Sequence, residues 1–447
     1  MKILFLWLVI ITISAFPVTS YSQNKVDSLL KEASLDDCVR FALKNQPLIR
    51  QAQIDEDITE NTIKSNLAGW LPQLNAGFLF QHYLKLPTSF FPDANGAKRP
   101  VQTGVKYTSN VQFLVNQPIF NRDLLLATTT ARDVRRQARQ TTTADKIDIT
   151  VAVSKAYYDL LLTQRQVEVL DENIVRAERS LQDAYNQYKG GIVDKTDYKR
   201  AQIELNNTRA ARKQAFDQIN GKAAVLKQAM GYPTDHPVSI RYDSLQLERD
   251  AFTDTTRNVT FSNRIEYQLL QTQQSLLQAD LKYARYSYLP TVSANGNYIP
   301  TFQSDQLTNL YGGIYPTSLI GLSFTIPIFQ GGKRIYDIRN ATLQVKRSEW
   351  DRIALTQQIN AQYFQALSAY KGTLAELNAL KENVELARDV YNTLRLQYNA
   401  GIKTYLDVVI AETDLRAAEL NYFNALFGVL SSKLDVEQAA GTVRLER

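Results

Sequence analysis

The chain has 447 residues, of which 44% are hydrophobic and 21% are charged, and its formal net charge is +6. This composition argues against global disorder, and the length exceeds what one compact core usually holds, so two domains or a repeated architecture are expected. Acidic residues are mixed among the basic ones, and the lack of a Lys/Arg stripe argues against nucleic-acid binding.

Residues 1–22 are predicted to be a secretory signal peptide. An apolar run from Ile3 to Phe16 is followed by Ser20 and Ser22, which stand at the −3 and −1 positions of a candidate cleavage site. An uncleaved membrane anchor is the alternative, but the run is shorter than the roughly 20 apolar residues of a spanning helix. No later stretch approaches that length, so contact with a membrane would require a β-barrel.

The mature chain is predicted to begin with an amphipathic helix near Ser34, where Ser34 and Asp37 fit a capping box. Cys38 lies in the same helical pattern. As the sole cysteine it cannot form an internal disulfide, and we expect a buried thiol. Strand-like segments follow at about 71–83 and 105–118.

The strand-like segments alternate with a period of two, and similar ones recur at about 289–302 and 317–328. In residues 105–115 one face is largely apolar and the other is mostly polar. An apolar face toward lipid and a polar face toward a lumen is typical of outer-membrane β-barrels. Four strands are too few to enclose a water-filled lumen, and open edges cannot persist in lipid. Several subunits must therefore share one barrel.

Very long helices are predicted after each pair of strands. From Phe120 to Lys189 the sequence contains neither Gly nor Pro, and no Pro follows Pro327. At 1.5 Å per residue, the first of these helices would span roughly 100 Å. Its apolar stripe is narrow, so we expect such helices to pack side by side, as in a coiled coil or a helical barrel.

The chain also repeats itself. Residues 186–201 align with residues 396–411 at a constant offset. The corresponding pairs are Tyr188 and Tyr398, Gly191 and Gly401, Ile192 and Ile402, Asp197 and Asp407, and Gly231 and Gly441. The repetition divides the mature chain into a first structural repeat at 23–230, a connector at 231–257 and a second structural repeat at 258–447.

The sequence resembles the TolC-type outer-membrane efflux proteins, also called outer membrane factors. The resemblance covers essentially the whole mature chain. It is carried by SLDDCVRFALKNQPLIRQAQ at 34–53, by the strands that begin at Leu71-Pro72 and Leu289-Pro290, and by the two glycine turns. It implies a mixed α and β, mostly α fold: a homotrimer with a 12-stranded outer-membrane β-barrel, continued by a 12-helix periplasmic α-barrel with an equatorial belt near 231–257.

The resemblance further implies a passive channel-tunnel in the outer membrane of a Gram-negative cell envelope. Drugs or other small molecules would enter from an inner-membrane pump through a periplasmic adaptor, which is a membrane fusion protein. An exit duct for type I protein secretion would share this fold and serve another pump. A periplasmic coiled-coil scaffold without a pore is a third reading, which the strand alternation disfavours.

Neither enzymatic activity, a cofactor nor a metal site is expected. His82 and His236 are the only histidines, and they lack metal-ligand spacing. The sequence also contains no phosphate-binding loop and no nucleophile elbow.

The resemblance places a periplasmic gate at the second glycine turn. By alignment, Asp407 is the carboxylate that would form a ring around the axis. Ile410 stands where the family can carry a second acidic ring, so a hydrophobic constriction is expected there. The alternative for Asp407 is a purely local role in the first turn of a helix, where the dipole favours an acidic side chain.

The remaining gate and docking positions are also carried over by alignment. Tyr398 and Lys403 occupy latch positions on the inner helix pair, and Thr196 and Asp197 occupy the partner positions on the outer pair. In such families the helical tips meet the adaptor. The expected docking residues are Gly191, Ile192, Gly401 and Ile402, and a glycine at each helix end allows the chain to reverse.

Overall fold

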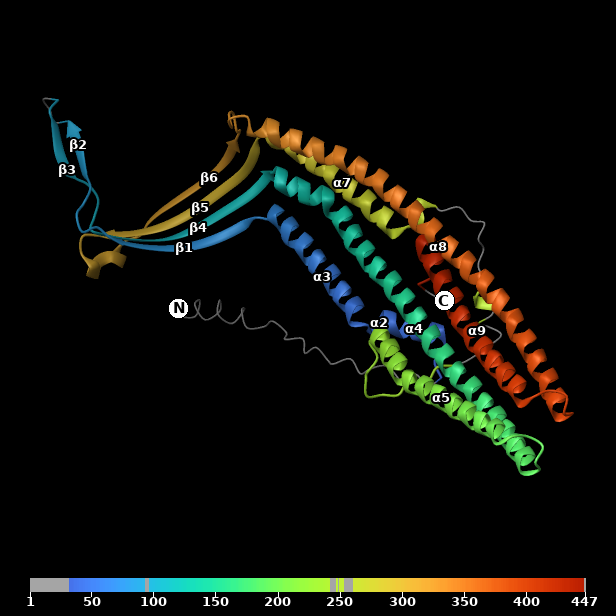
Figure 1. The fold of residues 1–447 in the computed structure, drawn as a ribbon. Coiled ribbons are helices and arrows are strands. Elements are labelled where there is room, and N and C mark those ends of the chain that lie inside the picture. Colours follow the sequence, from blue (N-terminus) through green and yellow to red (C-terminus); the bar gives the residue numbers. More distant parts are fainter. Residues whose placement is uncertain (1–31, 93–95, 242–246, 248, 253–259, 446–447) are drawn as a thin grey trace.

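The computed structural model describes residues 32–92, 96–241, 247, 249–252 and 260–445. The predicted signal peptide and parts of the predicted connector lie outside the described residues. The fold is mixed α and β and mostly α, as expected. The long strands gather at one end of the molecule and the tips of the long helices lie at the other end (Figure 1).

The first repeat contains two short helices, two long strands separated by a small hairpin, and two long helices. In chain order these are α2 (Leu35–Asn45), α3 (Pro47–Leu67), the 3-10 helix η1 (Ala68–Trp70), β1 (Gln73–His82), β2 (Thr88–Pro92), β3 (Lys98–Gln102), β4 (Tyr107–Phe120), α4 (Arg122–Lys189) and α5 (Lys195–Met230). The small β2–β3 hairpin lies in a segment for which no element was predicted from the sequence.

The start of α2 confirms the predicted capping box. Ser34 N donates to Asp37 Oδ2 at 3.1 Å, and Asp37 N donates to Ser34 Oγ at 3.2 Å. Cys38 on the same helix is fully buried, as expected, and burial raises the pKa of its thiol to about 12. An inert thiol in the core follows from that environment.

The second repeat follows the same order. It contains η2 (Phe261–Asn263), α7 (Ile265–Arg285), η3 (Tyr286–Tyr288), β5 (Thr291–Ser304), η4 (Leu307–Gly312), β6 (Tyr315–Thr325), α8 (Lys333–Asn399) and α9 (Tyr405–Ala440). The entry into the strands is the same in both repeats. Leu71 N donates to Ala68 O at 3.0 Å, and Leu289 N donates to Tyr286 O at 3.0 Å. The proline that follows each leucine lies directly before the first residue of the strand, and its fixed φ suits extended backbone.

The four long strands form one antiparallel sheet in the order β1-β4-β5-β6 (Figure 1). Its registers contain the pairs Gln73 with Asn116, Tyr107 with Ser304, and Thr291 with Thr325. The β4–β5 register shifts between Pro118 and Phe120. Proline cannot donate to the ladder, so a bulge at this end of β4 costs little pairing.

This sheet is open on its faces and edges in the single chain. Among the described residues, β1 and β6 each pair with one strand only. Large apolar side chains at alternate positions are exposed, including Phe78, Phe80, Ile320, Leu322 and Phe324. Unpaired strand edges are templates for further strands, and an extended exposed apolar surface marks an interaction site.

Two helices dominate the shape of the molecule. α4 has 68 residues and α8 has 67, so each spans roughly 100 Å. The prediction of very long helices is confirmed, and α4 packs along α5 as α8 packs along α9 (Figure 1). None of the helices in the described part of the chain combines the length and apolar character needed to cross a membrane.

The main core lies where the two long hairpins pack against each other and α2 packs on α4 and α5, well away from the sheet. It contains Cys38, Tyr157, Leu226, Tyr370 and Leu430, all buried. The connector is tied to this core through its backbone. Tyr157 Oη donates to Arg241 O at 2.7 Å, and Tyr370 Oη donates to Ala251 O at 2.9 Å.

The glycines that end α5 and α9 are equivalent in structure. Gly231 has φ +66° and Gly441 has φ +69°. A Cβ on Gly231 would lie 2.8 Å from Gln46 Cα, and one on Gly441 would lie 2.8 Å from the carbonyl carbon of Asn263. In each repeat, the end of the last helix therefore packs against the segment that precedes α3 or α7.

Candidate functional site

Two helical turns lie farthest from the sheet (Figure 1). They have the same hydrogen-bond pattern. After α4, Gly191 N donates to Tyr188 O and Ile192 N donates to Gln187 O; after α8, Gly401 N donates to Tyr398 O and Ile402 N donates to Gln397 O. These are Schellman motifs, which require a left-handed residue after the helix. Gly191 and Gly401 supply it with φ +69° and +73°.

The isoleucines of these turns project into solvent. Ile192 is 75% exposed and Ile402 is 72% exposed. In a Schellman motif the residue at this position usually packs on the preceding turn of the helix, but here that turn offers Gln187 or Gln397. Each tip therefore has an apolar side chain that remains exposed in the single chain and that a partner could bury.

Asp407 forms a capping box at the start of α9. Its Oδ2 accepts hydrogen bonds from Thr404 N at 3.0 Å and from Thr404 Oγ1 at 2.8 Å. These hydrogen bonds, with a smaller contribution from the charge of Lys403, lower the pKa of Asp407. The carboxylate is therefore ionised at neutral pH. The alternative predicted from the sequence, a local role in the first turn of the helix, is present, and it leaves the charge available to a ring.

The neighbours of Asp407 at this tip are accessible. Lys403 is exposed in the turn, and Ile410 is 51% exposed on the helix surface one turn beyond Asp407. An apolar side chain that is half exposed, such as Ile410, stabilises the assembly only if another surface covers it.

Tyr398 is buried inside its own hairpin. Its ring lies 5.4 Å from that of Tyr405, and its hydroxyl has no hydrogen-bond partner among the residues that the structure describes. Burial, followed by the charges of Asp197 and Asp183, raises the pKa of Tyr398 to about 12. The hydroxyl thus remains a donor at every physiological pH and is near the first hairpin, without a direct bond to it.

Thr196 and Asp197 lie in the first turn of α5, which starts at Lys195. Asp197 occupies the position in α5 that Asp407 occupies in α9, three residues after the N-cap. The tips of the two hairpins therefore bring the predicted gate residues to one end of the molecule, with Asp197 close enough to influence Tyr398 electrostatically.

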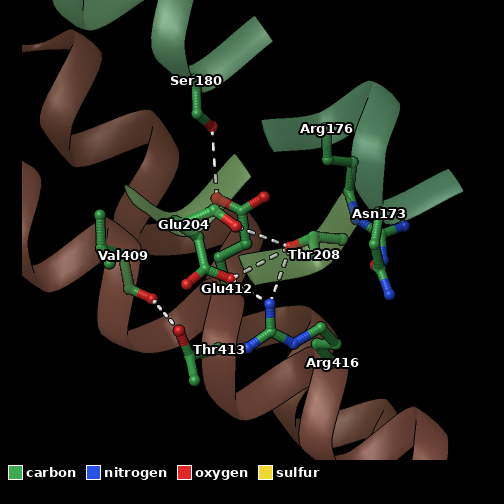
Figure 2. A network of polar contacts seen from close by, with 9 residues as sticks. All are labelled: Asn173, Arg176, Ser180, Glu204, Thr208, Val409, Glu412, Thr413 and Arg416. Atoms are coloured by element: carbon green, nitrogen blue, oxygen red, sulfur yellow. Dashed lines mark hydrogen bonds and ion pairs between the residues drawn. The ribbon is translucent and has the colours of Figure 1, made fainter. Parts of the chain in front are cut away.

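A buried polar network, which was not predicted from the sequence, joins the two hairpins near these tips (Figure 2). Arg416 of α9 donates to Glu204 of α5, and also to Thr208 Oγ1 at 2.7 Å. Farther from the tip, Glu419 of α9 accepts from Arg176 of α4 at 3.0 Å and from Arg388 of α8 at 3.2 Å. Both of these glutamates are buried and paired with guanidinium groups.

Glu412 differs from the other two buried glutamates. It is 4% exposed, its Oε2 accepts from Ser180 Oγ at 3.4 Å, and its Oε1 is buried with no hydrogen-bond partner within the described ranges. Burial, and next the charge of Glu204, raises the pKa of Glu412 to about 7.

A sequence signal for this network exists in α9. Its buried positions near the tip follow a heptad pattern: Tyr405, Val408, Glu412, Leu415 and Glu419. Glu412 and Glu419 therefore occupy the same core position of the seam, one heptad apart. Acidic residues at such positions are costly to bury and indicate a specific polar partner.

No described group of His, Cys, Asp and Glu side chains is arranged to hold a metal ion.

Comparison with known proteins finds a family whose model matches most of the chain. A family model described as outer membrane efflux protein matches residues 39–232 and 256–442. Outer membrane protein TolC of Vibrio cholerae serotype O1 is 22% identical over 443 residues, covering 95% of this chain and 94% of that protein. The alkaline protease secretion protein AprF of Pseudomonas aeruginosa is 23% identical over 301 residues, covering 66% of this chain and 62% of that protein.

The fold has solved counterparts as well. The outer membrane protein VceC from Vibrio cholerae superposes with a TM-score of 0.72 at 16% identity, covering 91% of this chain and 96% of that chain. At this identity the likeness establishes the architecture only.

Proposed function

The chain belongs to the outer membrane efflux protein family, and from that premise we propose that it is the outer-membrane channel of a tripartite efflux system. Three copies form the channel. It conducts drugs or other small molecules passively from an inner-membrane pump and a periplasmic adaptor to the outside. The role requires neither catalysis nor a cofactor.

The observation that carries this proposal is the open sheet. β1 and β6 have free edges in the described chain, and apolar side chains such as Phe78 and Ile320 are exposed on it. In a bilayer every backbone N–H and C=O group needs a partner, so the edges must be closed by strands of other copies. Three chains with four strands each give a closed barrel of a size known to hold an aqueous lumen.

The division of the chain supports the same proposal. We take residues 23–230 and 258–447 as structural repeats joined by a connector at 231–257. The matching Schellman turns and the matching glycines at Gly231 and Gly441 support this division. Repeats that share a backbone plan can surround one axis in a near-symmetric ring.

For the gate, we propose that Asp407 forms a ring of like charges at the periplasmic end and that Ile410 forms an apolar constriction beside it. Tyr398 and Lys403 act as a latch toward Thr196 and Asp197 of the other hairpin. The ionised state of Asp407 and the exposure of Ile410 support the first part. The unpartnered hydroxyl of Tyr398 supports the second, because its free donor has a nearby carboxylate in Asp197.

For the adaptor, we propose docking at Gly191, Ile192, Gly401 and Ile402. The two tips share one backbone geometry and one exposed apolar side chain, so a partner with repeated binding elements can engage both in the same way. Small glycine surfaces let the partner approach the backbone closely.

Export of proteins is the second candidate function. The relative AprF is named for secretion of an alkaline protease. Deleting the gene and measuring both drug sensitivity and release of an exported protein separates the two candidates. Efflux predicts drug sensitivity with normal protein release, and secretion predicts the reverse.

The channel itself is tested with the purified full-length chain. We expect a trimer in detergent by light scattering and discrete conductance steps in a planar bilayer. A periplasmic scaffold without a pore predicts no conductance and no recovery from outer-membrane fractions. A chain that stays monomeric in detergent contradicts the shared barrel.

A further inference from the structure

We propose that Glu412 is a proton-responsive lock between the two long hairpins, α4–α5 and α8–α9. When its carboxyl group is neutral the hairpins stay packed together, and when it is ionised their contact near the tips loosens. The consequence for channel opening rests on the proposed function, whereas the change in hairpin packing does not.

The geometry around Glu412 carries this inference. Glu204 and Glu419 are equally buried, but each is paired with at least one arginine. Glu412 receives one long hydrogen bond from Ser180, and its other oxygen has no partner in the described chain. A buried carboxylate without a donating cation carries a large desolvation cost, which a bound proton removes.

Every element around Glu412 contributes a charged or polar group, and Figure 2 shows Arg176, Ser180, Glu204 and Arg416 among them. These groups are Arg176 and Ser180 on α4, Glu204 on α5, Tyr391, Arg388 and Arg395 on α8, and Tyr405, Arg416 and Glu419 on α9. Arg416 donates to Glu204, and Arg176 and Arg388 donate to Glu419. Each of these three arginines therefore already has a carboxylate partner, and the largest charge effect on an ionised Glu412 is repulsion from Glu204, across the interface between α9 and α5.

The direction of the effect follows from the raised pKa. Glu412 has a folded-state pKa of about 7 against an ordinary value of 4.5. Its contribution to stability is thus greatest below 4.5, falls as the pH rises from 4.5 to 7, and is least above 7, where the packed state must hold the charge. Acidification is expected to tighten the two hairpins, and a rise through neutrality is expected to release them.

The experiment measures the distance between the hairpins as a function of pH. Spin labels are placed on Lys189→Cys and Asn399→Cys, which are exposed at the ends of α4 and α8, in a Cys38→Ala background. One labelled chain per assembly, in detergent, removes distances between subunits. With Glu412 present, we expect a longer distance to become populated with a midpoint near pH 7.

Two variants and one control decide the result. Glu412→Gln keeps the shape and removes the titration, so only the short distance should remain from pH 5 to pH 9. Glu204→Gln frees Arg416 for Glu412 and should shift the midpoint to lower pH by about one unit or more. The control Asp414→Asn removes an exposed charge from the same helix and should leave the midpoint unchanged.

A transition that persists in Glu412→Gln, or a wild-type distance that does not respond between pH 5 and pH 9, overturns the lock. The infrared band of the protonated carboxyl provides the second measurement. A band that titrates near pH 7 without any change in distance also overturns it. If the distance changes as expected but bilayers show no current, the lock stands and the proposed channel function fails.

Discussion

Replacing Gly441 with alanine should destabilise the protein more than the same change at Gly401. Both glycines end a long helix in the left-handed region, with φ +69° and +73°. A non-glycine residue there costs about 1–2 kcal/mol, and that cost is common to both variants. Only at Gly441 would the new Cβ lie 2.8 Å from the backbone of Asn263, whereas nothing lies within 4 Å of a Cβ at Gly401.

The difference in stability between Gly441→Ala and Gly401→Ala therefore measures the steric cost alone. Backbone atoms cannot move aside as a flexible side chain does, and overpacking of this kind costs about 1–3 kcal/mol. We expect Gly401→Ala to cost about 1–2 kcal/mol and Gly441→Ala about 2–5 kcal/mol, the sum of the two effects. The other repeat offers a second pair, because Gly231 is equally crowded and Gly191 is equally open.

The assay is the apparent unfolding temperature of each purified variant in the same detergent and at one scan rate, since assemblies of this kind unfold irreversibly. Gly441→Ala should unfold at a lower temperature than Gly401→Ala. Equal unfolding temperatures for both pairs would refute the reasoning that the crowded glycines close each repeat.

Three further predictions concern the tips. Asp407→Ala should reduce cation block in a planar bilayer, because it removes one negative charge per subunit from the proposed ring; unchanged block would exclude Asp407 from the gate. Tyr398→Phe combined with Lys403→Ala should increase the single-channel current by loosening the closed tip, and a current equal to wild type would count against the latch. Ile192→Ser and Ile402→Ser should each weaken adaptor binding roughly 10- to 100-fold in calorimetry, the effect of losing one buried isoleucine, and equal affinity would remove the tips from the docking surface.

The long elements were predictable because each carries a strong periodic signal. The alternation that predicted strands at 105–118 and 317–328 corresponds to β4 and β6, and the stretch without Gly or Pro after Phe120 corresponds to α4. The capping box at Ser34 was predictable for the same reason, because its hydrogen bonds join residues three positions apart.

Contacts between distant segments were harder to predict. Arg416 reaches Glu204 across more than two hundred residues, and nothing local to either side chain indicates the pairing. The heptad pattern of α9 does mark Glu412 as a core position, but it cannot show which helix faces that position or whether a cation does. The β2–β3 hairpin was missed because its strands are short and carry little alternation.

The free edges of the sheet also constrain how the protein is made. A lone chain cannot enter the bilayer and wait there for its partners, because its unsatisfied backbone groups would meet hydrocarbon. Encounter of the subunits and membrane insertion must therefore be one step, whose rate rises steeply with the concentration of newly exported chains. A defective chain that still pairs through β1 or β6 would then inactivate the assemblies that it joins. A variant with a change in an edge strand should therefore have a dominant-negative effect on the wild type.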